Sequence, residues 1–381
     1  MNRFIRLLLY TYIFVASWTL AYNVGNWFSV PNIIVILLIP LYFINLLIKG
    51  KIKTAVYKVE DIFLFFSLSF IMISYLVNNG NPNYILAYFF TFVIAYLIMK
   101  QIYYEFCNIE KLFKINTITI IFISVFIIVE FLGHYIFNVN IRKIMHFGAV
   151  PEATYLKVFH RSYGFSTEPT NLGYYINALG PIGLWNLYKT KTIKKGFKIL
   201  ITIVYIFGWI TTFSAATFVS FFASLFIVII YNLYKIEKKR FQGRKYFIML
   251  ISLIVIIMFV AMFNEKHSQI TTFIKPIINK LSISRISSNK NNVLSGRYYR
   301  WTRDLDRFTK KPILGYGPGS TTIIFGSSSV NWYINLLVEN GIFTFMFMIL
   351  FFANSLVRIL KSNIPNKNFI LLGYIASLIH L

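Results

Sequence analysis

The chain has 381 residues, of which 57% are hydrophobic and only 13% charged, and its formal net charge is +26. A soluble domain carries about a quarter of its residues as Asp, Glu, Lys or Arg, so this composition excludes an ordinary soluble protein. The basic excess does not indicate nucleic-acid binding, because the basic residues stand in short clusters between apolar runs of membrane-spanning length. The single cysteine, Cys107, excludes an internal disulfide and a thiolate metal cluster.

The apolar runs predict an all-α polytopic integral membrane protein with about 11 transmembrane helices. The runs are residues 4–22, 32–48, 61–77, 84–102, 112–137, 171–188, 199–213, 216–234, 246–263, 331–356 and 369–381. The first run lacks a small-residue cleavage site, so we expect no cleavable signal peptide. The last run would form only about 20 Å of helix, against a hydrocarbon core of about 30 Å. We therefore expect the chain to be truncated there, with a short docked helix as the alternative.

The basic residues predict the orientation of these spans. With a cytoplasmic N-terminus, the further cytoplasmic connections are the Lys- and Arg-containing ones, residues 49–58, 100–114, 189–198, 235–245 and 358–367. The short outer connections, around residues 23–30, 78–83 and 213–215, contain neither Lys nor Arg, which is the positive-inside pattern. The two large outer loops are then residues 138–170 and 264–330. No internal repeat divides the chain, so residues 1–381 are predicted to form a single membrane domain.

The end of the first outer loop combines an arginine, an acid and a helix start. Pro169 suits the first turn of the next helix, so Thr167 or Glu168 is expected to cap that helix. Arg161 and the unpaired N–H groups of this helix end then form an anion-attracting spot, with Glu168 beside them. The alternative is an interfacial loop in which Arg161 meets lipid phosphate and Glu168 only caps the helix.

The second outer loop contains a cluster of arginines. With Ser295 as N-cap, the segment up to Phe308 predicts a helix with Arg297, Arg300, Arg303 and Arg307 on one flank and Trp301, Leu305 and Phe308 on the adjoining flank. Such a helix lies in the membrane interface, where guanidinium groups can bind diphosphate oxygens in pairs. Simple adhesion to anionic lipid is the alternative. The following stretch, residues 312–320, lacks G-x-G-x-x-G spacing and predicts a tight turn.

Polar residues also enter the span at 331–356. Asn331, Asn335 and Glu339 step by four residues and so share one side of a helix. An acid at membrane depth is functional or specifically paired, and a structural hydrogen bond to a neighbouring helix is the alternative for Glu339. Glu130, with His134 one turn on, is expected to form a local pair with that histidine or to line a water-exposed edge. The histidines show no metal-ligand spacing, so neither a metal nor a cofactor is expected.

Two stretches resemble a known family. The second loop and span 10 resemble the conserved block of the O-antigen ligase and repeat-unit polymerase (Wzy-type) superfamily, through Ser295-Gly296-Arg297, Trp301, Phe308, residues 312–317, Asn331, Tyr333-Ile334, Leu337, Glu339 and Gly341. The pattern Arg161, Gly164-Phe165, Glu168-Pro169 resembles the arginine-containing loop of capsule and exopolysaccharide polymerases. The resemblance implies a GT-C-like fold with two large outer loops.

The resemblance also implies a metal-independent glycosyl transfer at the outer face of the cytoplasmic membrane. A polymer on undecaprenyl diphosphate is the donor, and a lipid-linked repeat unit is the acceptor whose hydroxyl attacks the donor's anomeric carbon. Arg161 and Arg297 would stabilise the leaving diphosphate, Glu168 would accept the proton, and Glu339 would orient an arginine or the helix packing. The substrate or its diphosphate would be bound by Arg300, Arg303, Tyr299 and Asn331. The implied partners are the lipid bilayer, the two lipid-linked oligosaccharides, a chain-length regulator and a flippase, with no nucleic acid.

Two other functions compete with polymerisation of capsule, exopolysaccharide or O-antigen. The ligase branch of the superfamily typically has His-Asn where this chain has Val330-Asn331, which favours polymerisation over ligation and leaves the general base open. A lipid-linked oligosaccharide flippase would place charges along a central cavity and often shows repeats. Here the charges, apart from Glu130 and Glu339, lie outside the spans. The sugars and their linkage stay undetermined.

Overall fold

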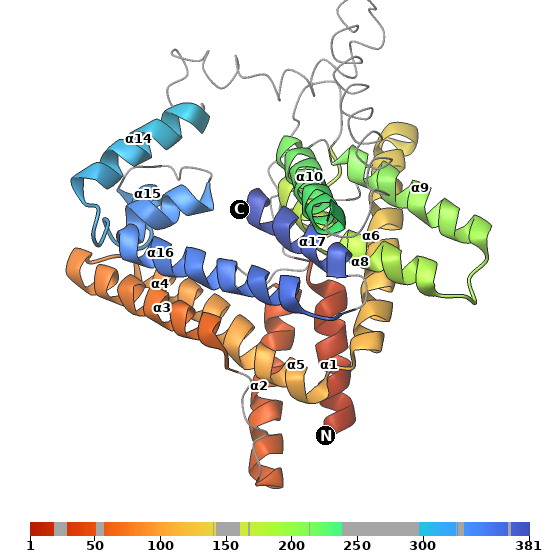
Figure 1. Cartoon of the computed structure of the whole chain (residues 1–381), viewed down its shortest axis with the longest axis horizontal. Coiled ribbons are helices and arrows are strands. Elements are labelled where there is room, and N and C mark those ends of the chain that lie inside the picture. The colour runs from red at the N-terminus through yellow and green to blue at the C-terminus, as the bar shows by residue number, and fades with distance from the viewer. Residues whose placement is uncertain are drawn as a thin grey trace, which may run out of the picture. The chain divides into compact units, whose positions relative to one another are not determined.

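The computed structural model describes residues 1–18, 29–50, 57–139, 141, 161–166, 168–212, 214–237, 297–324, 326, 331–364 and 367–381. Every regular element among these residues is a helix, which confirms the all-α prediction for this part of the chain (Figure 1). In chain order the elements are α1 (Asn2–Val15), α2 (Val30–Lys49), α3 (Val59–Asn78), α4 (Pro82–Phe89), the π-helix η1 (Phe90–Ile98), α5 (Met99–Phe106), α6 (Ile109–Phe137), α8 (Pro169–Lys189), α9 (Lys195–Thr211), α10 (Ala215–Glu237), α14 (Arg297–Lys310), α15 (Ser320–Ile323), α16 (Trp332–Lys361) and α17 (Lys367–His380).

Five helices in the described residues are long and apolar enough to cross a membrane. They are Val30–Lys49, Val59–Asn78, Pro82–Phe106, Ile109–Phe137 and Trp332–Lys361, and each coincides with a predicted span. Five of the other predicted runs contain α1, α8, α9, α10 and α17. The run at 246–263 lies outside the described residues, as do Ser295 and most of the two predicted outer loops. The total of about 11 spans and their orientation therefore stay predictions.

Local sequence explains where the helices begin and end. Proline occupies the first turn of α2, α4 and α8, where its missing N–H has no helical partner to lose. An asparagine side chain accepts a backbone N–H of the first turn in three helices, α4, α6 and α16. Three helices, α2, α3 and α6, end at a residue with positive φ, namely Gly50, Asn79 and Asn138.

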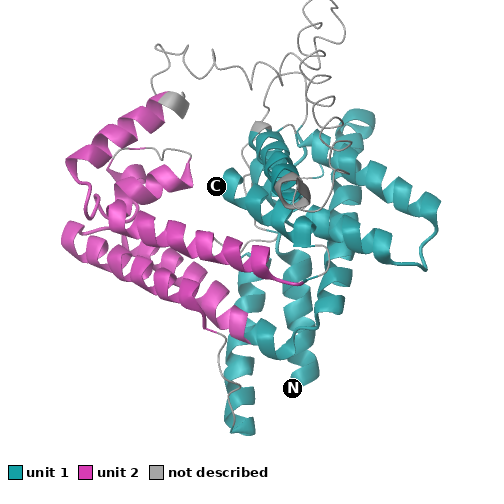
Figure 2. Ribbon diagram, in the orientation of Figure 1, with its two compact units in different colours: residues 1–53, 102–260, 364–380 teal, residues 54–101, 261–363, 381 magenta. Residues whose placement is uncertain are grey.

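The chain divides into two compact units (Figure 2). Unit 1 comprises residues 1–53, 102–260 and 364–380, and its described helices include α1, α2, α6, α8, α9, α10 and α17. Unit 2 comprises residues 54–101, 261–363 and 381, and includes α3, α4, η1, α14, α15 and α16. The prediction of a single membrane domain with outer loops 138–170 and 264–330 stays a prediction.

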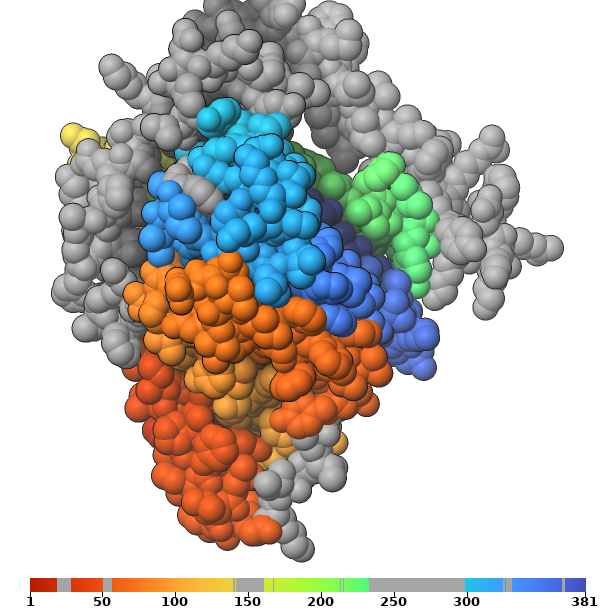
Figure 3. Space-filling view, turned by 90° about the vertical axis from the view of Figure 1, so that its left-hand side faces the viewer, coloured from red at the N-terminus to blue at the C-terminus, as the bar shows by residue number. Residues whose placement is uncertain are grey.

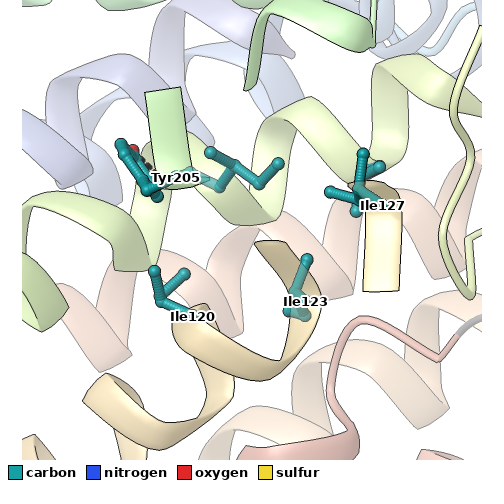
Figure 4. Packing of buried hydrophobic residues seen from close by; sticks show 6 residues of the cluster. Ile120, Ile123, Ile127 and Tyr205 are labelled. Carbon is teal, nitrogen blue, oxygen red and sulfur yellow. Dashed lines mark hydrogen bonds between the residues drawn. The ribbon is translucent and has the colours of Figure 1, made fainter. Parts of the chain in front are cut away.

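The core of unit 1 is an apolar cluster between α6, α8 and α9 (Figure 4). It consists of Ile120, Ile123, Ile127, Leu172, Ile176 and Tyr205, all buried. Polar groups link α8 to α9 and α10, because the buried Asn177 of α8 donates to the Thr217 carbonyl of α10 at 2.8 Å and accepts from Trp209 Nε1 of α9 at 2.9 Å. Close packing and interhelical hydrogen bonds of this kind hold helices together where lipid is as apolar as the side chains.

The core of unit 2 is the helix pair α3 and α16. Leu64 of α3 is buried with Leu336, Met348 and Phe351 of α16. At the start of α3, the buried Asp61 accepts Lys100 Nζ at 2.6 Å, and Glu60 pairs with Arg358 near the end of α16. Figure 3 shows the segment from α14 to α15 (cyan to blue) bordering α3 and α4 (orange) on one face of this unit, and Lys311 and Leu314, which follow α14, bind Asn78 and Ser74 of α3. The arginine helix α14 packs on α16, which in turn packs on α3.

Candidate functional site

The Arg161 segment, residues 161–166 of unit 1, is bound by a buried acid of α6. The N–H groups of Tyr163 and Gly164 donate to Glu130 Oε2 at 3.1 and 2.8 Å. Only 2% of the Glu130 surface is exposed. The sequence predicts a local pair with His134 or a water-exposed edge at Glu130, and this stays a prediction; the Glu130 carboxylate also accepts backbone N–H groups 33 and 34 residues later. This contact has no sequence signal, because a backbone N–H is present at nearly every position.

Aromatic and polar contacts hold the rest of the Arg161 segment. The ring of Phe165 stacks on Trp18 with centroids 4.4 Å apart and on Phe126 at 4.1 Å. Ser166 Oγ donates to the Ser17 carbonyl at 2.9 Å. The segment therefore packs against both α6 and the residues that follow α1, and it is an ordered part of unit 1.

Arg161 itself lies at the C-terminal end of α9. Its Nε donates to the carbonyl of Thr212, the C-cap residue of α9, at 3.1 Å. The neighbouring N–H of Ser162 donates to the Thr211 carbonyl at 3.0 Å. A cation at this position is favourable because helix C-termini carry partial negative charge. The Arg161 side chain is half-buried, and its Nε is held by the Thr212 carbonyl.

Glu168 occupies the N-cap position of α8, with extended backbone and Pro169 in the first turn. Its side chain accepts no N–H of the helix, and it is exposed. The predicted helix start is therefore confirmed, but Glu168 does not cap through its carboxylate, and Thr167 lies outside the described residues. The anion-attracting spot expected from Arg161 and the first turn of α8 stays a prediction.

In unit 2, α14 carries the predicted arginine cluster around a buried acid. Asp304 is 0% exposed; Arg303 Nε and Nη2 lie 2.8 and 3.2 Å from its two oxygens, and Arg307 Nη1 lies 3.0 Å from Oδ1. Arg303 and Arg307 thus share a flank, as predicted, but they bind Asp304, which sequence analysis overlooked. The pairing of Asp304 with Arg307 could have been found from their spacing of three residues, which places both on one helix face, whereas the adjacent position of Arg303 gives no such signal.

The other predicted residues of α14 differ in what surrounds them. Arg297 is the first residue of the helix, and its side chain lies outside the described atoms. Arg300 is half-buried, while Tyr299 is exposed. On the predicted apolar flank, Leu305 is exposed and Trp301 is half-buried. The helix therefore presents both aromatic and cationic side chains at its surface.

The turn after α14 docks onto a break in α16. Gly341 has φ 79° and ψ −179°, so the helix backbone is interrupted there. Three hydrogen bonds join the turn to this break: Tyr316 N–H to the Val338 carbonyl at 3.0 Å, Gly317 N–H to the Glu339 carbonyl at 2.8 Å, and Ile342 N–H to the Pro312 carbonyl at 2.8 Å. The tight turn predicted at 312–320 is thereby confirmed. Irregular backbone in a spanning helix requires such protein partners.

Glu339 lies about two turns into α16 and is buried against α15. Its Oε1 accepts the hydroxyl of Thr321, in a short hydrogen bond, and the Thr321 N–H at 3.3 Å. Asn331 precedes the helix as its N-cap and accepts the Ile334 N–H at 3.0 Å. The predicted polar stripe therefore begins at a cap and ends at the break, and Glu339 joins α16 to the segment that follows the arginine helix.

The structure assigns the predicted residues to two sets. Arg161 and Glu168 belong to unit 1, whereas Tyr299, Arg300, Arg303, Asn331 and Glu339 belong to unit 2, together with Arg297. Residues 200–349 match the family model described as O-antigen ligase, a range that contains Arg297 and Glu339 and follows Arg161 and Glu168. No curated protein and no solved structure matches the chain.

Proposed function

The chain belongs to the O-antigen ligase and polymerase superfamily, and we propose that it polymerises undecaprenyl-diphosphate-linked oligosaccharide repeat units into a surface polysaccharide. The carrying observation is that the family match covers α14 and the docked turn, where arginines are held in place by a buried acid. A protein that handles diphosphate-linked lipids needs such fixed guanidinium groups.

The proposed topology has about 11 spans and a cytoplasmic N-terminus. The Lys-rich connections support this orientation, since basic residues concentrate in short cytoplasmic loops. The two arginine-bearing segments then face the outer side of the cytoplasmic membrane. A lipid-linked repeat unit exposed on that side, together with the bilayer, is the partner that this arrangement requires; a chain-length regulator and a flippase would act beside it.

In the proposed reaction, a hydroxyl oxygen of the acceptor sugar forms a bond to the anomeric carbon of the donor. The bond from that carbon to the diphosphate oxygen breaks, and its electron pair leaves with undecaprenyl diphosphate. Because the leaving diphosphate gains charge in the transition state, a preplaced guanidinium stabilises that state more than the ground state. We assign this role to Arg161 and Arg297, with support from Arg300. Binding of the substrates is assigned to Arg303, Tyr299 and Asn331.

The proton of the attacking hydroxyl needs an acceptor, and we assign it to Glu168. Its carboxylate is exposed and caps no helix N–H, so it is available for proton transfer. Glu339 is buried and bound to Thr321, which supports a role in orienting the segment that follows α14.

Ligation is the second candidate, favoured by the description of the matched family model. In a ligase, the same donor would pass its whole glycan to a different acceptor. Val330 stands where ligases typically have histidine, which supports polymerisation instead.

The experiment is deletion of the gene in its host, followed by gel analysis of lipid-linked and surface glycans. Polymerisation predicts that a single lipid-linked repeat unit replaces the ladder, and that wild type restores the ladder. Arg161→Ala and Arg297→Ala should each reduce polymer by at least about a hundredfold, as loss of a transition-state donor does. Arg6→Ala, at an exposed arginine of α1, is the matched control and should restore the ladder. Full-length polymer retained on its lipid would establish ligation, and repeat units confined to the cytoplasmic side would establish transport.

A further inference from the structure

Glu130 is an acid inside a spanning helix, and its carboxylate accepts hydrogen bonds from main-chain N–H groups. It lies on α6, which is apolar and long enough to cross a membrane, and its carboxylate accepts the N–H groups of Tyr163 and Gly164 at 2.8–3.2 Å. An acid in such a helix is unfavourable unless it is bound, and acids of this kind are functional by default. The reaction proposed above does not use it.

The two N–H groups form a concave anion site. Gly164 has φ +56°, and the left-handed conformation turns two successive N–H groups toward the same carboxylate. Any side chain at this position would be strained, and its Cβ would lie 3.3 Å from Leu172 Cδ1. Gly164 makes the concavity, and Glu130 fills it.

Arg161 is therefore fixed from two directions. On one side, its Nε and the Ser162 N–H are bound by the last carbonyls of α9 at 3.1 and 3.0 Å. On the other side, the main chain two and three residues later is bound to α6 through Glu130. Glu130 thereby adds a link to α6 beside the α9 contacts, the packing of Phe165 and the hydrogen bond from Ser166 to Ser17.

We propose that Glu130 is a positioning residue for Arg161: its carboxylate holds the Arg161 segment where the guanidinium can act on a diphosphate. The proposal rests on the proposed function. A fixed guanidinium stabilises a transition state without reorganisation, and a misplacement of about 1 Å can lower the rate about a hundredfold. A carboxylate suits the task because it only accepts hydrogen bonds, whereas a glutamine would turn an NH₂ toward one of the two N–H donors.

Hydrogen exchange tests the geometry without any activity assay. In purified full-length protein in lipid nanodiscs, Glu130→Gln should speed amide exchange in the peptide containing Tyr163 and Gly164 by at least about tenfold. Glu105→Gln is the matched control: this acid of unit 1 accepts the Tyr42 hydroxyl at 2.8 Å, and its substitution should leave that peptide unchanged. Unchanged exchange in Glu130→Gln would overturn the proposal.

A double-mutant cycle tests whether Glu130 acts through Arg161. The substrate is the lipid-linked repeat unit extracted from the deletion strain, and chain growth is measured in liposomes. Glu130→Gln should lower kcat by about tenfold to a hundredfold with KM changed less than about threefold. The double variant Glu130→Gln/Arg161→Ala should be no slower than Arg161→Ala alone. Effects that multiply would mean that Glu130 acts independently, and the proposal would fail.

The outcomes separate this proposal from the proposed function. If Arg161→Ala keeps full activity, the assigned role of Arg161 fails, whatever the exchange shows. If Arg161→Ala is inactive while Glu130→Gln is fully active, the function stands and the positioning role fails. Should Glu130→Gln not accumulate, Glu130→Asp keeps the charge on a shorter side chain, and its exchange and kcat should fall between wild type and the values expected for Glu130→Gln.

Discussion

The Arg161 segment and α14 hold their arginines by opposite means. In the Arg161 segment, the acid comes from a distant helix and binds backbone N–H groups, so it fixes the main chain near the arginine. In α14, the acid is Asp304, which belongs to the same helix and binds the guanidinium groups of Arg303 and Arg307 directly. The first arrangement fixes the main chain beside the arginine, whereas the second places opposite charges in direct contact.

The difference indicates separate roles for the two sets of arginines. Arg303 and Arg307 donate some of their N–H groups to Asp304, which suits residues that stabilise α14 and bind substrate. Arg161 Nε donates to the main-chain carbonyl of Thr212, and we assign the Arg161 guanidinium to the leaving diphosphate. Glu339 combines both modes, because it accepts a side-chain hydroxyl and a backbone N–H of the same residue, Thr321.

The largest effect on stability is expected from Asp304→Asn. It leaves two partly buried guanidinium groups without their counter-charge, and should lower the free energy of unfolding by about 3 kcal/mol. The measurement is thermal unfolding in detergent. Asp306→Asn is the matched control, since the Asp306 side chain is 68% exposed and its ion pair is with the exposed Lys310. Its effect should stay within about 0.5 kcal/mol. Equal effects of the two variants would show that Asp304 is no anchor of α14.

Sequence reasoning recovered the elements that depend on local pattern. Pro169 predicts the start of α8, helical periodicity predicts the arginine helix α14, and glycines predict the turn at 312–320. Each of these signals acts within a few residues. The break at Gly341 was not foreseen, because an apolar run around a glycine predicts a continuous helix. Only the docking of the preceding turn supplies the hydrogen bonds that permit the break.

The acids of the candidate site were harder to predict. The sequence shows Glu339 and Glu130 as charges in apolar runs, but the groups that bind them come from segments well separated along the chain. The partner of Glu130 is backbone 33 residues away, and that of Glu339 is a threonine in a four-residue helix. Neither partner has a residue type or spacing that marks it, so tertiary packing alone determines the contact.

A smaller effect on stability is expected from Thr321→Val, which removes the side-chain hydrogen bond to Glu339 and keeps the backbone one. The substitution keeps the shape but removes the hydroxyl that donates to a buried carboxylate, and should destabilise the protein by about 2 kcal/mol. Thr309→Val is the matched control, because the exposed Thr309 hydroxyl bonds only its own helix, at the Asp306 carbonyl, 2.7 Å away. Thermal unfolding of both variants distinguishes the cases; equal stability would mean that the Glu339 carboxylate finds other donors.

The smallest effect on stability is expected from Gly164→Ala, which tests whether the left-handed turn at Gly164 presents the two N–H groups to Glu130. Alanine at a φ of +56° is strained and meets Leu172, so the free energy of unfolding should fall by about 1 kcal/mol. Gly196→Ala should have the opposite sign, a gain of about 0.5 kcal/mol, because Gly196 lies in α9 with open space around it. If Gly164→Ala is neutral in unfolding yet lowers polymer formation, strain has moved the Arg161 segment instead of weakening the fold. If both variants are neutral in both measurements, the left-handed turn is not what presents the two N–H groups to Glu130, and main-chain fixation loses its basis.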